Sequence, residues 1–356
     1  MGPSPLHRIP IIVGAFLALV TLMVAGLFRV AYFWEDLRKP HVLQRICAWA
    51  AAASVFIILV EGMIRYSAPA PWYDVKTMMT DPGSVPVYGQ RRLFIWPAVF
   101  LKYLVPQLTH IQAFLIVQIF AIAITVYIVG VWSALFVGRE LKYIGQLILA
   151  VLLFPTFRYY NGHDFGVIIF YTAAFLFLYK RQYWAYAVAV CVGMLNHQNV
   201  LLLIPTAFAI LWGNEKRSTV LRLVGLTAAA YFIIQFVLNI VMPIPQTHEI
   251  KVWWNIREIV ELQQGLVIGQ LPLLAWYAFG IAALYRAEDF LKRAMVLLPM
   301  QYGVYFLFGQ LNETRIFNGF IPILIGIFLC HLRGGFAVTV SRVSEGQVKS
   351  GIVLTD

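Results

Sequence analysis

The sequence predicts an all-α, polytopic integral membrane protein with about eleven transmembrane helices and short interfacial helices in its outer loops. Of its 356 residues, 61% are hydrophobic and 12% are charged, and the mean hydropathy is +0.78. Soluble domains are usually about 45–50% apolar and about 25% charged. A second observation is that long apolar runs follow one another along most of the chain. A third is that the basic residues gather in alternate turns between these runs.

About eleven apolar runs are long enough to cross, or nearly cross, the roughly 30 Å hydrocarbon core of a bilayer. In chain order they are Ile9–Phe33, Ile46–Ile64, Ile111–Phe136, Ile144–Phe157, Phe165–Tyr179, Trp184–Leu195, Val200–Trp212, Leu223–Met242, Leu266–Leu284, Met295–Phe308 and Ile316–Leu332. The first run is longer than the roughly 7–15-residue core of a signal peptide, so we expect an uncleaved span. Several runs are short and polar at one end, which favours helices around a cavity over helices bathed in lipid.

Two further segments do not fit a crossing. Phe94–Leu108 is apolar but short, contains two prolines, and carries Lys102 near its centre. Counting it as a span would invert every later turn against the positive-inside rule. Glu249–Gln264 places Trp253 and Trp254 beside charged residues, and tryptophan prefers the headgroup level. We expect the second segment to lie at the interface, and the first to be interfacial or re-entrant.

Basic residues predict the orientation of the chain. One set of turns is rich in them, with Arg38, Lys39, Arg45, Arg139, Lys142, Lys180, Arg181, Lys216, Arg217, Arg222, Arg286, Lys292, Arg293 and Arg333. The opposite set holds few, namely Arg158, Lys251, Arg257 and Arg315. The outward loop Arg65–Leu93, within the outer loop 65–110, is an exception, since it carries Arg65, Lys76, Arg91 and Arg92. The basic set should be cytoplasmic. We therefore expect a multi-pass protein of the cell inner membrane, with a periplasmic N-terminus and a cytoplasmic C-terminus.

The domain organisation is simple. Residues 1–332 should form a single transmembrane domain, and residues 333–356 a flexible cytoplasmic tail. The net charge of +11 does not indicate a nucleic-acid partner, because the basic residues sit in short turns where they set topology. The three cysteines all lie inside apolar runs and are expected to be buried free thiols rather than a disulfide framework.

The segment from Arg158 to Asn199 organises the polar residues of the chain. Two apolar runs are joined there by the short basic turn Lys180-Arg181, and each has a polar cluster at its far end. Because antiparallel helices of similar length share that turn, both clusters should reach the same side of the membrane. One cluster holds Arg158, Asn161, His163 and Asp164, and the other holds Asn196, His197, Gln198 and Asn199. We expect His163 and His197 to face away from the cytoplasm.

Each cluster also has a simpler structural interpretation. Asp164 is well placed to be a helix N-cap, since aspartate favours that position and complements the helix dipole. The amides around His197 can serve helix–helix hydrogen bonds instead of a wet cavity. Two histidines and one aspartate from different loops do not make a metal signature, so neither a metal nor another cofactor is predicted.

The outer loop offers a candidate base and a candidate phosphate clamp. Asp74 follows two aromatic residues, and a carboxylate at a membrane surface can deprotonate an acceptor hydroxyl. Arg91 and Arg92 can bind a phosphate in bidentate fashion, or simply touch lipid headgroups. Glu313 and Arg315 form a polar break between the last two spans, and charges at the membrane edge need partners.

The layout of the chain resembles the GT-C type of polytopic glycosyltransferases, which use polyprenyl-phosphate-linked sugars. The shared features are an early outward loop with an aspartate, an interfacial helix and many short, polar-ended spans. A more local likeness to bacterial membrane proteins of that group rests on Leu195-Asn196 and on Glu313-Thr314-Arg315. There an Asn-Arg-Glu-Thr run opens a span, whereas this chain has His197-Gln198-Asn199 after its asparagine.

The resemblance implies an inverting glycosyltransferase that works at the outer face of the membrane. It implies that Asp74 is the catalytic residue and that no nucleotide sugar is used. Substrate would contact Arg91, Arg92, Arg158, His163, Asp164, His197, Glu313 and Arg315. Membrane lipids and a polyprenyl-phosphate sugar are the expected partners. The alternative is an inactive GT-C-like body that serves as a structural subunit of a larger membrane complex, which the missing Arg-Glu pair favours.

Overall fold

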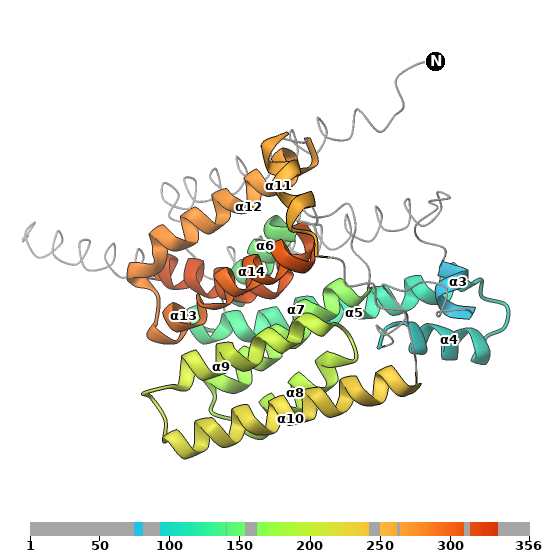
Figure 1. Ribbon diagram of the computed structural model, residues 1–356, viewed down its shortest axis with the longest axis horizontal. Helices are drawn as coiled ribbons and strands as arrows, with labels where there is room; N and C mark the ends of the chain where they lie inside the picture. Colours follow the sequence, from blue (N-terminus) through green and yellow to red (C-terminus); the bar gives the residue numbers. More distant parts are fainter. Residues whose placement is uncertain are drawn as a thin grey trace, which may run out of the picture.

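The computed structural model describes residues 75–80, 93–139, 141–153, 162–241, 250–261, 264–309 and 314–333. These residues form an all-helical bundle without strands (Figure 1). The all-α prediction is therefore confirmed for this part of the chain. The first two predicted spans, Ile9–Phe33 and Ile46–Ile64, lie outside the described residues, and so does the tail after Arg333.

The helices follow the predicted apolar runs closely. They are α3 (Val75–Thr80), α4 (Ile95–Leu104), α5 (His110–Val137), α6 (Lys142–Leu153), α7 (Gly162–Tyr179), α8 (Tyr183–Met194), η5 (Gln198–Leu202), α9 (Leu203–Leu211), α10 (Arg217–Val241), α11 (Val252–Val260), α12 (Gln264–Ala283), η6 (Leu284–Arg286), α13 (Asp289–Ala294), α14 (Leu297–Phe308) and η7 (Thr314–Phe320), followed by a helical segment over 321–333.

Helix lengths fall into two groups. α5 has 28 residues and α10 has 25, or about 42 and 38 Å at 1.5 Å per residue. Within the described residues these are the two helices long and apolar enough to cross a membrane. By contrast α8 and α14 have 12 residues each, about 18 Å, and α4 has 10, about 15 Å. These short helices are therefore less than half as long as the two long ones.

The core lies around α7, which packs against α5, α8 and η7. Its centre is aromatic: the rings of Trp132, Phe136, Phe175 and Tyr179 contact one another at centroid distances of 4.9 to 6.4 Å. The buried Trp132 indole also donates to the carbonyl of Pro322 at 2.8 Å. These contacts fix α5, α7 and the final helical segment to one another, since buried aromatic pairs combine large buried area with specific geometry.

Basic turns from distant parts of the sequence meet at one end of the bundle. Arg333 Nη1 donates to the Phe136 carbonyl at 3.4 Å and lies 3.9 Å from Glu288 Oε1. The Tyr179 hydroxyl donates to Glu288 Oε2 at 2.8 Å. These contacts bring together the ends of α5, α7 and the last helical segment at the turn before α13. We call this the basic end.

The α9–α10 turn belongs to the same end, which lies on the left of Figure 1. Arg293 of α13 donates to the Trp212 carbonyl, and Arg181 of the α7–α8 turn lies 3.3 Å from Glu215. The described turns predicted to be cytoplasmic are thus gathered on one side. Their common location follows from helix connectivity, because each antiparallel pair returns the chain to the same end.

At the opposite end, α3 and α4 pack on the first turns of α5. Met79, Ile95, Ala98, Ala113 and Phe114 form a small separate core there. α5 begins with a capping box, in which the Thr109 hydroxyl accepts from the Gln112 N–H at 3.2 Å and the Gln112 amide oxygen accepts from the Thr109 N–H at 2.8 Å. The ten residues of α4 span only about half of a 30 Å bilayer core.

Candidate functional site

The far ends of α7 and α8 lie side by side at the end opposite the basic turns. A Cβ atom built on Gly166, in the first turns of α7, would stand 2.4 Å from Oδ1 of Asn196. It would also stand 2.4 Å from Cε2 of Phe94, the residue before α4. Asp164, two residues before Gly166, is 5% exposed, and Asn196 is 1% exposed. Only glycine at position 166 lets these polar groups approach so closely.

A hydrogen-bonded network extends this site toward α14. The Asn199 side-chain amide donates to the Tyr305 hydroxyl at 2.8 Å, and the Tyr171 hydroxyl donates to the Asn199 carbonyl at 2.6 Å. His197 caps η5, because its Nδ1 accepts from the Asn199 N–H at 3.1 Å. A neutral imidazole that accepts at Nδ1 carries its proton at Nε2, so Nε2 is a hydrogen-bond donor.

We call Asp164, Asn196, His197, Asn199 and Tyr305 the polar cluster. Its members lie near the start of α7 and near the ends of α8 and α14. Buried polar groups at such helix ends need hydrogen-bond partners within the protein. Asp164, Asn196 and His197 were predicted to lie at one end, and the close approach of Gly166 to Asn196 brings the start of α7 and the end of α8 together there.

Further buried amides lie beside the polar cluster. Gln301 of α14 is fully buried beside the Tyr171 hydroxyl, with which it interacts, although its Nε2 and Oε1 complete no hydrogen bond of good geometry with the described residues. A Cβ atom built on Gly319 would stand 2.7 Å from Gln301 Nε2 and 2.7 Å from Tyr171 Cε1, so the two side chains meet at this glycine. Oδ1 of Asn199 likewise lacks a described partner. Buried amide groups with remaining hydrogen-bonding capacity are suited to hold a polyhydroxylated ligand or an ordered water.

The amphipathic helix α11 covers the end of α14. Asn255 is fully buried, and its Nδ2 lies 2.9 Å from the Phe306 carbonyl and 3.0 Å from the Gly309 carbonyl. On the outer face, Trp253 is 79% exposed. Glu261 raises the pKa of Arg257 above its ordinary value through a side-chain hydrogen bond and its charge. This pattern of buried amide, exposed tryptophan and exposed charge is typical of a helix at a membrane interface.

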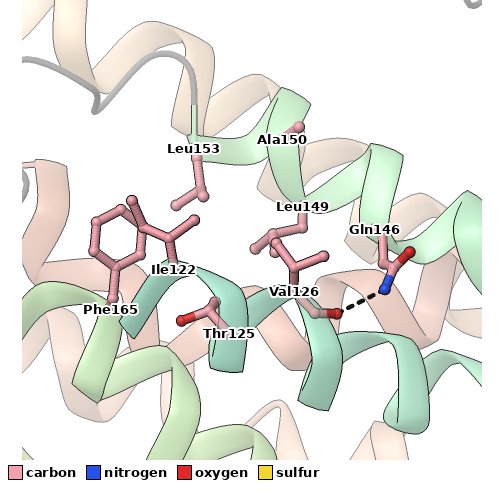
Figure 2. A pocket seen from close by; sticks show the side chains of 8 residues that line it. All are labelled: Ile122, Thr125, Val126, Gln146, Leu149, Ala150, Leu153 and Phe165. Carbon is pink, nitrogen blue, oxygen red and sulfur yellow. Dashed lines mark hydrogen bonds between the residues drawn. The ribbon is translucent and has the colours of Figure 1, made fainter. Parts of the chain in front are cut away.

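A small apolar pocket lies between α5, α6 and the start of α7 (Figure 2). It holds only about 10 Å³ of space, roughly enough for one water molecule, and is lined by Ile122, Thr125, Val126, Gln146, Leu149, Ala150, Leu153 and Phe165. Figure 2 shows Ile122, Leu153 and Phe165 converging at one side, whereas Gln146 donates to the Val126 carbonyl at the other. Its lining suits hydrocarbon, and it holds no ionisable side chain.

The predicted charged residues are distributed unevenly over the described structure. Asp74, Arg91, Arg92, Arg158 and Glu313 lie outside the described residues. The backbones of His163 and Arg315 are described, in α7 and η7 respectively. Within the described part of the chain, no three His, Cys, Asp or Glu side chains gather as a metal-ligand group.

Sequence reasoning missed Gln301, Tyr305, Tyr171 and Asn255. Gln301 was detectable as a lone amide inside the apolar run Met295–Phe308, where an uncharged polar residue is costly without a partner. The two tyrosines carried no such signal, because tyrosine is common in apolar cores and its hydrogen-bond partner is set by packing.

Comparison with known proteins adds no relative. The chain matches no protein-family model, no curated protein and no solved structure.

Proposed function

We propose that this chain is a polytopic membrane protein of the GT-C glycosyltransferase type. Membrane placement is supported by the surface of α10, of which only 11% of the most apolar stretch is buried. Its exposed side chains include Phe232, Phe236 and Ile240, one helical turn apart and each more than 60% exposed. A soluble protein rarely exposes a continuous apolar stripe of this kind.

The two ends of the bundle support the proposed orientation. Exposed tryptophans lie at both, Trp184 at the basic end and Trp253 on α11 at the other. Tryptophan is enriched at both membrane interfaces, and lysine and arginine are enriched in cytoplasmic turns. The basic end is therefore assigned to the cytoplasm and the polar cluster to the outer half of the inner membrane. About eleven helices would cross, or nearly cross, the membrane, with α4 and α11 at the outer interface.

The observation that carries the functional proposal is the polar cluster itself. Buried amides, a tyrosine hydroxyl and the His197 imidazole converge at the outer helix ends, beside an apolar pocket that begins at Phe165. Amide and imidazole groups hydrogen-bond sugar hydroxyls. The apolar lining of the pocket matches a prenyl chain in chemistry, and its present space of about 10 Å³ would have to widen to admit one. A polyprenyl-phosphate sugar combines these two chemistries in one molecule.

In the proposed reaction, Asp74 takes the proton of an acceptor hydroxyl, and the acceptor oxygen attacks the anomeric carbon of the sugar. The bond between that carbon and the phosphate oxygen breaks, so polyprenyl phosphate leaves with the electron pair and the anomeric configuration inverts. Arg91, Arg92 and Arg158 hold the phosphate, whose charge the guanidinium groups complement. His163 and Glu313 would orient the sugar, and Asp164, His197 and Arg315 would also contact the substrate.

The test compares two acidic residues of the same outer loop. Full-length protein in mild detergent is incubated with synthetic polyprenyl-phosphate hexoses and a membrane-derived acceptor mixture, and release of polyprenyl phosphate is measured. Asp74→Asn should lower release by about 100-fold or more, while donor binding persists. Asp81→Asn is the matched control and should retain the wild-type rate. Equal rates in wild type and Asp74→Asn would exclude Asp74 as the base.

A second candidate is a structural subunit of a larger membrane complex. It is favoured by the use of Asn199 and Asn255 for contacts within the chain, and by His197-Gln198-Asn199 in place of charged residues. The broad exposed face of α10 offers a surface for another membrane helix. A stoichiometric partner protein in mild detergent, together with no release of polyprenyl phosphate from any donor, would establish this function instead.

A further inference from the structure

Arg181 has a backbone conformation that arginine rarely adopts. At the end of α7, the Gln182 N–H donates to the Phe177 carbonyl at 2.8 Å and the Arg181 N–H donates to the Leu178 carbonyl at 3.0 Å. This pattern is a Schellman motif, whose closing residue is usually glycine because its φ is positive. Here φ is 57° at Arg181, and no other non-glycine residue in the described ranges has a positive φ. An arginine at a glycine position indicates that its side chain has a role.

The guanidinium of Arg181 belongs to a basic surface built around the α9–α10 turn. The Arg293 guanidinium donates to the Trp212 carbonyl, and that of Arg217 lies 5.5 Å from the centre of the Trp212 ring. The Arg181 Nε lies 3.3 Å from Glu215 Oε1. The Arg181 patch is defined as Lys180, Arg181, Trp212, Lys216, Arg217 and Arg293.

The exposed surface of this patch is positively charged. The Arg181 side chain is 73% exposed, whereas the side chain of Glu215 is 18% exposed. Glu215 therefore pairs with Arg181 from a less exposed position and offsets one of the five positive charges of the patch. A positive surface of this kind attracts a phosphate diester, which guanidinium groups bind in bidentate fashion.

Apolar groups border the patch on the side toward the bundle. Leu221, one turn beyond Arg217 on α10, is 56% exposed, and Trp184 at the start of α8 is 74% exposed. In the membrane placement given above, these side chains mark the boundary between headgroups and hydrocarbon. The patch thus offers cations at headgroup level and, directly beside them, surface for acyl chains.

We propose that the Arg181 patch binds the phosphate of an anionic phospholipid in the leaflet at the basic end. The observations favour a lipid over free phosphate because the cations and the exposed apolar groups are adjacent. The proposal rests on the membrane placement of the proposed function and is independent of sugar transfer. The bound lipid would hold the α7–α8 turn against the α9–α10 turn.

The test uses a substitution that should improve the fold while removing the ligand contact. Full-length protein in nonionic detergent is titrated with phosphatidylglycerol or phosphatidylcholine, and bound lipid is counted by native mass spectrometry. Wild type should prefer phosphatidylglycerol. Arg181→Gly should raise the melting temperature, since glycine relieves the positive φ, yet weaken phosphatidylglycerol binding about fivefold.

Arg139→Ala is the matched control, because it removes one exposed charge at the same end outside the patch. It should leave phosphatidylglycerol binding within twofold of wild type. An equal loss in Arg139→Ala, or unchanged binding in Arg181→Gly, would overturn the proposal. Inorganic phosphate at 10 mM, roughly the concentration that would saturate a site for a free anion, should not displace the lipid fully. Full displacement would contradict the proposal. Carbonate extraction of each variant tests membrane placement separately.

Discussion

Replacing Asn255 by alanine is expected to release α11 from the end of α14. The Asn255 side chain is fully buried and its Nδ2 faces three carbonyl oxygens, those of Tyr305, Phe306 and Gly309, at 3.3, 2.9 and 3.0 Å. The amide nitrogen has two hydrogens, so it satisfies about two of these acceptors at a time. At about 1 kcal/mol net per hydrogen bond, the contact stabilises the docked helix by roughly 2 kcal/mol.

Hydrogen–deuterium exchange of the α11 amides measures this contact locally. A loss of roughly 2 kcal/mol in opening free energy corresponds to about 30-fold faster exchange, because 1.36 kcal/mol is a factor of ten. Asn255→Asp should exchange faster still, since it sets carboxylate oxygens against carbonyl oxygens. Ile256→Ala, on the exposed side of the same helix, is the control and should change exchange less than threefold.

Two results would contradict the proposed role of Asn255 in holding α11 against α14. One is exchange in Asn255→Ala within threefold of wild type, which would mean that the exposed apolar face of α11 holds the helix without Asn255. The other is acceleration spread evenly over the bundle, which would mean that the side chain supports global stability and not the α11–α14 contact. Both outcomes are read from one exchange experiment, with α7 as the reference, because α7 packs mainly against α5 and α8.

Two further predictions concern the site and the topology. Gly166→Ala should destabilise the protein by about 1–3 kcal/mol, because its new Cβ would clash with Asn196 and Phe94. Thermal unfolding in detergent measures this effect, and an unchanged melting temperature would contradict the close packing at Gly166. In a variant without native cysteines, an impermeant thiol reagent added to intact cells should label a cysteine at Gln107, beyond α4, and spare one at Gln182; the reverse pattern would invert the proposed orientation.

Helix positions could be predicted from the sequence because they depend on local composition. The run Ile111–Phe136 became α5, His110–Val137, and the run Leu266–Leu284 became α12, Gln264–Ala283. Apolar length and flanking polar residues determine where such helices begin and end. The short helix α13, Asp289–Ala294, was missed because its charged sequence is equally typical of a turn.

The meeting of Asp164 with the Asn196–Asn199 turn was also predictable, since one basic turn and two similar helix lengths impose it. Charge alone, however, directed attention to Arg91, Arg92, Arg158 and Glu313, which lie outside the described residues. The sequence marks where charges are costly, but it does not show which uncharged groups will be buried together.

Only the tertiary structure decided which uncharged polar groups the site contains. Asn199 reaches Tyr305 across more than a hundred residues, and Gln301 meets Tyr171 through the close approach at Gly319. The significance of Arg181 also depends on structure, because a positive φ is a property of the closed Schellman turn and not of the residue type. Local composition therefore determined the helices, whereas side-chain contacts between distant helices determined the polar cluster and the Arg181 patch, since such contacts depend on how the helices pack.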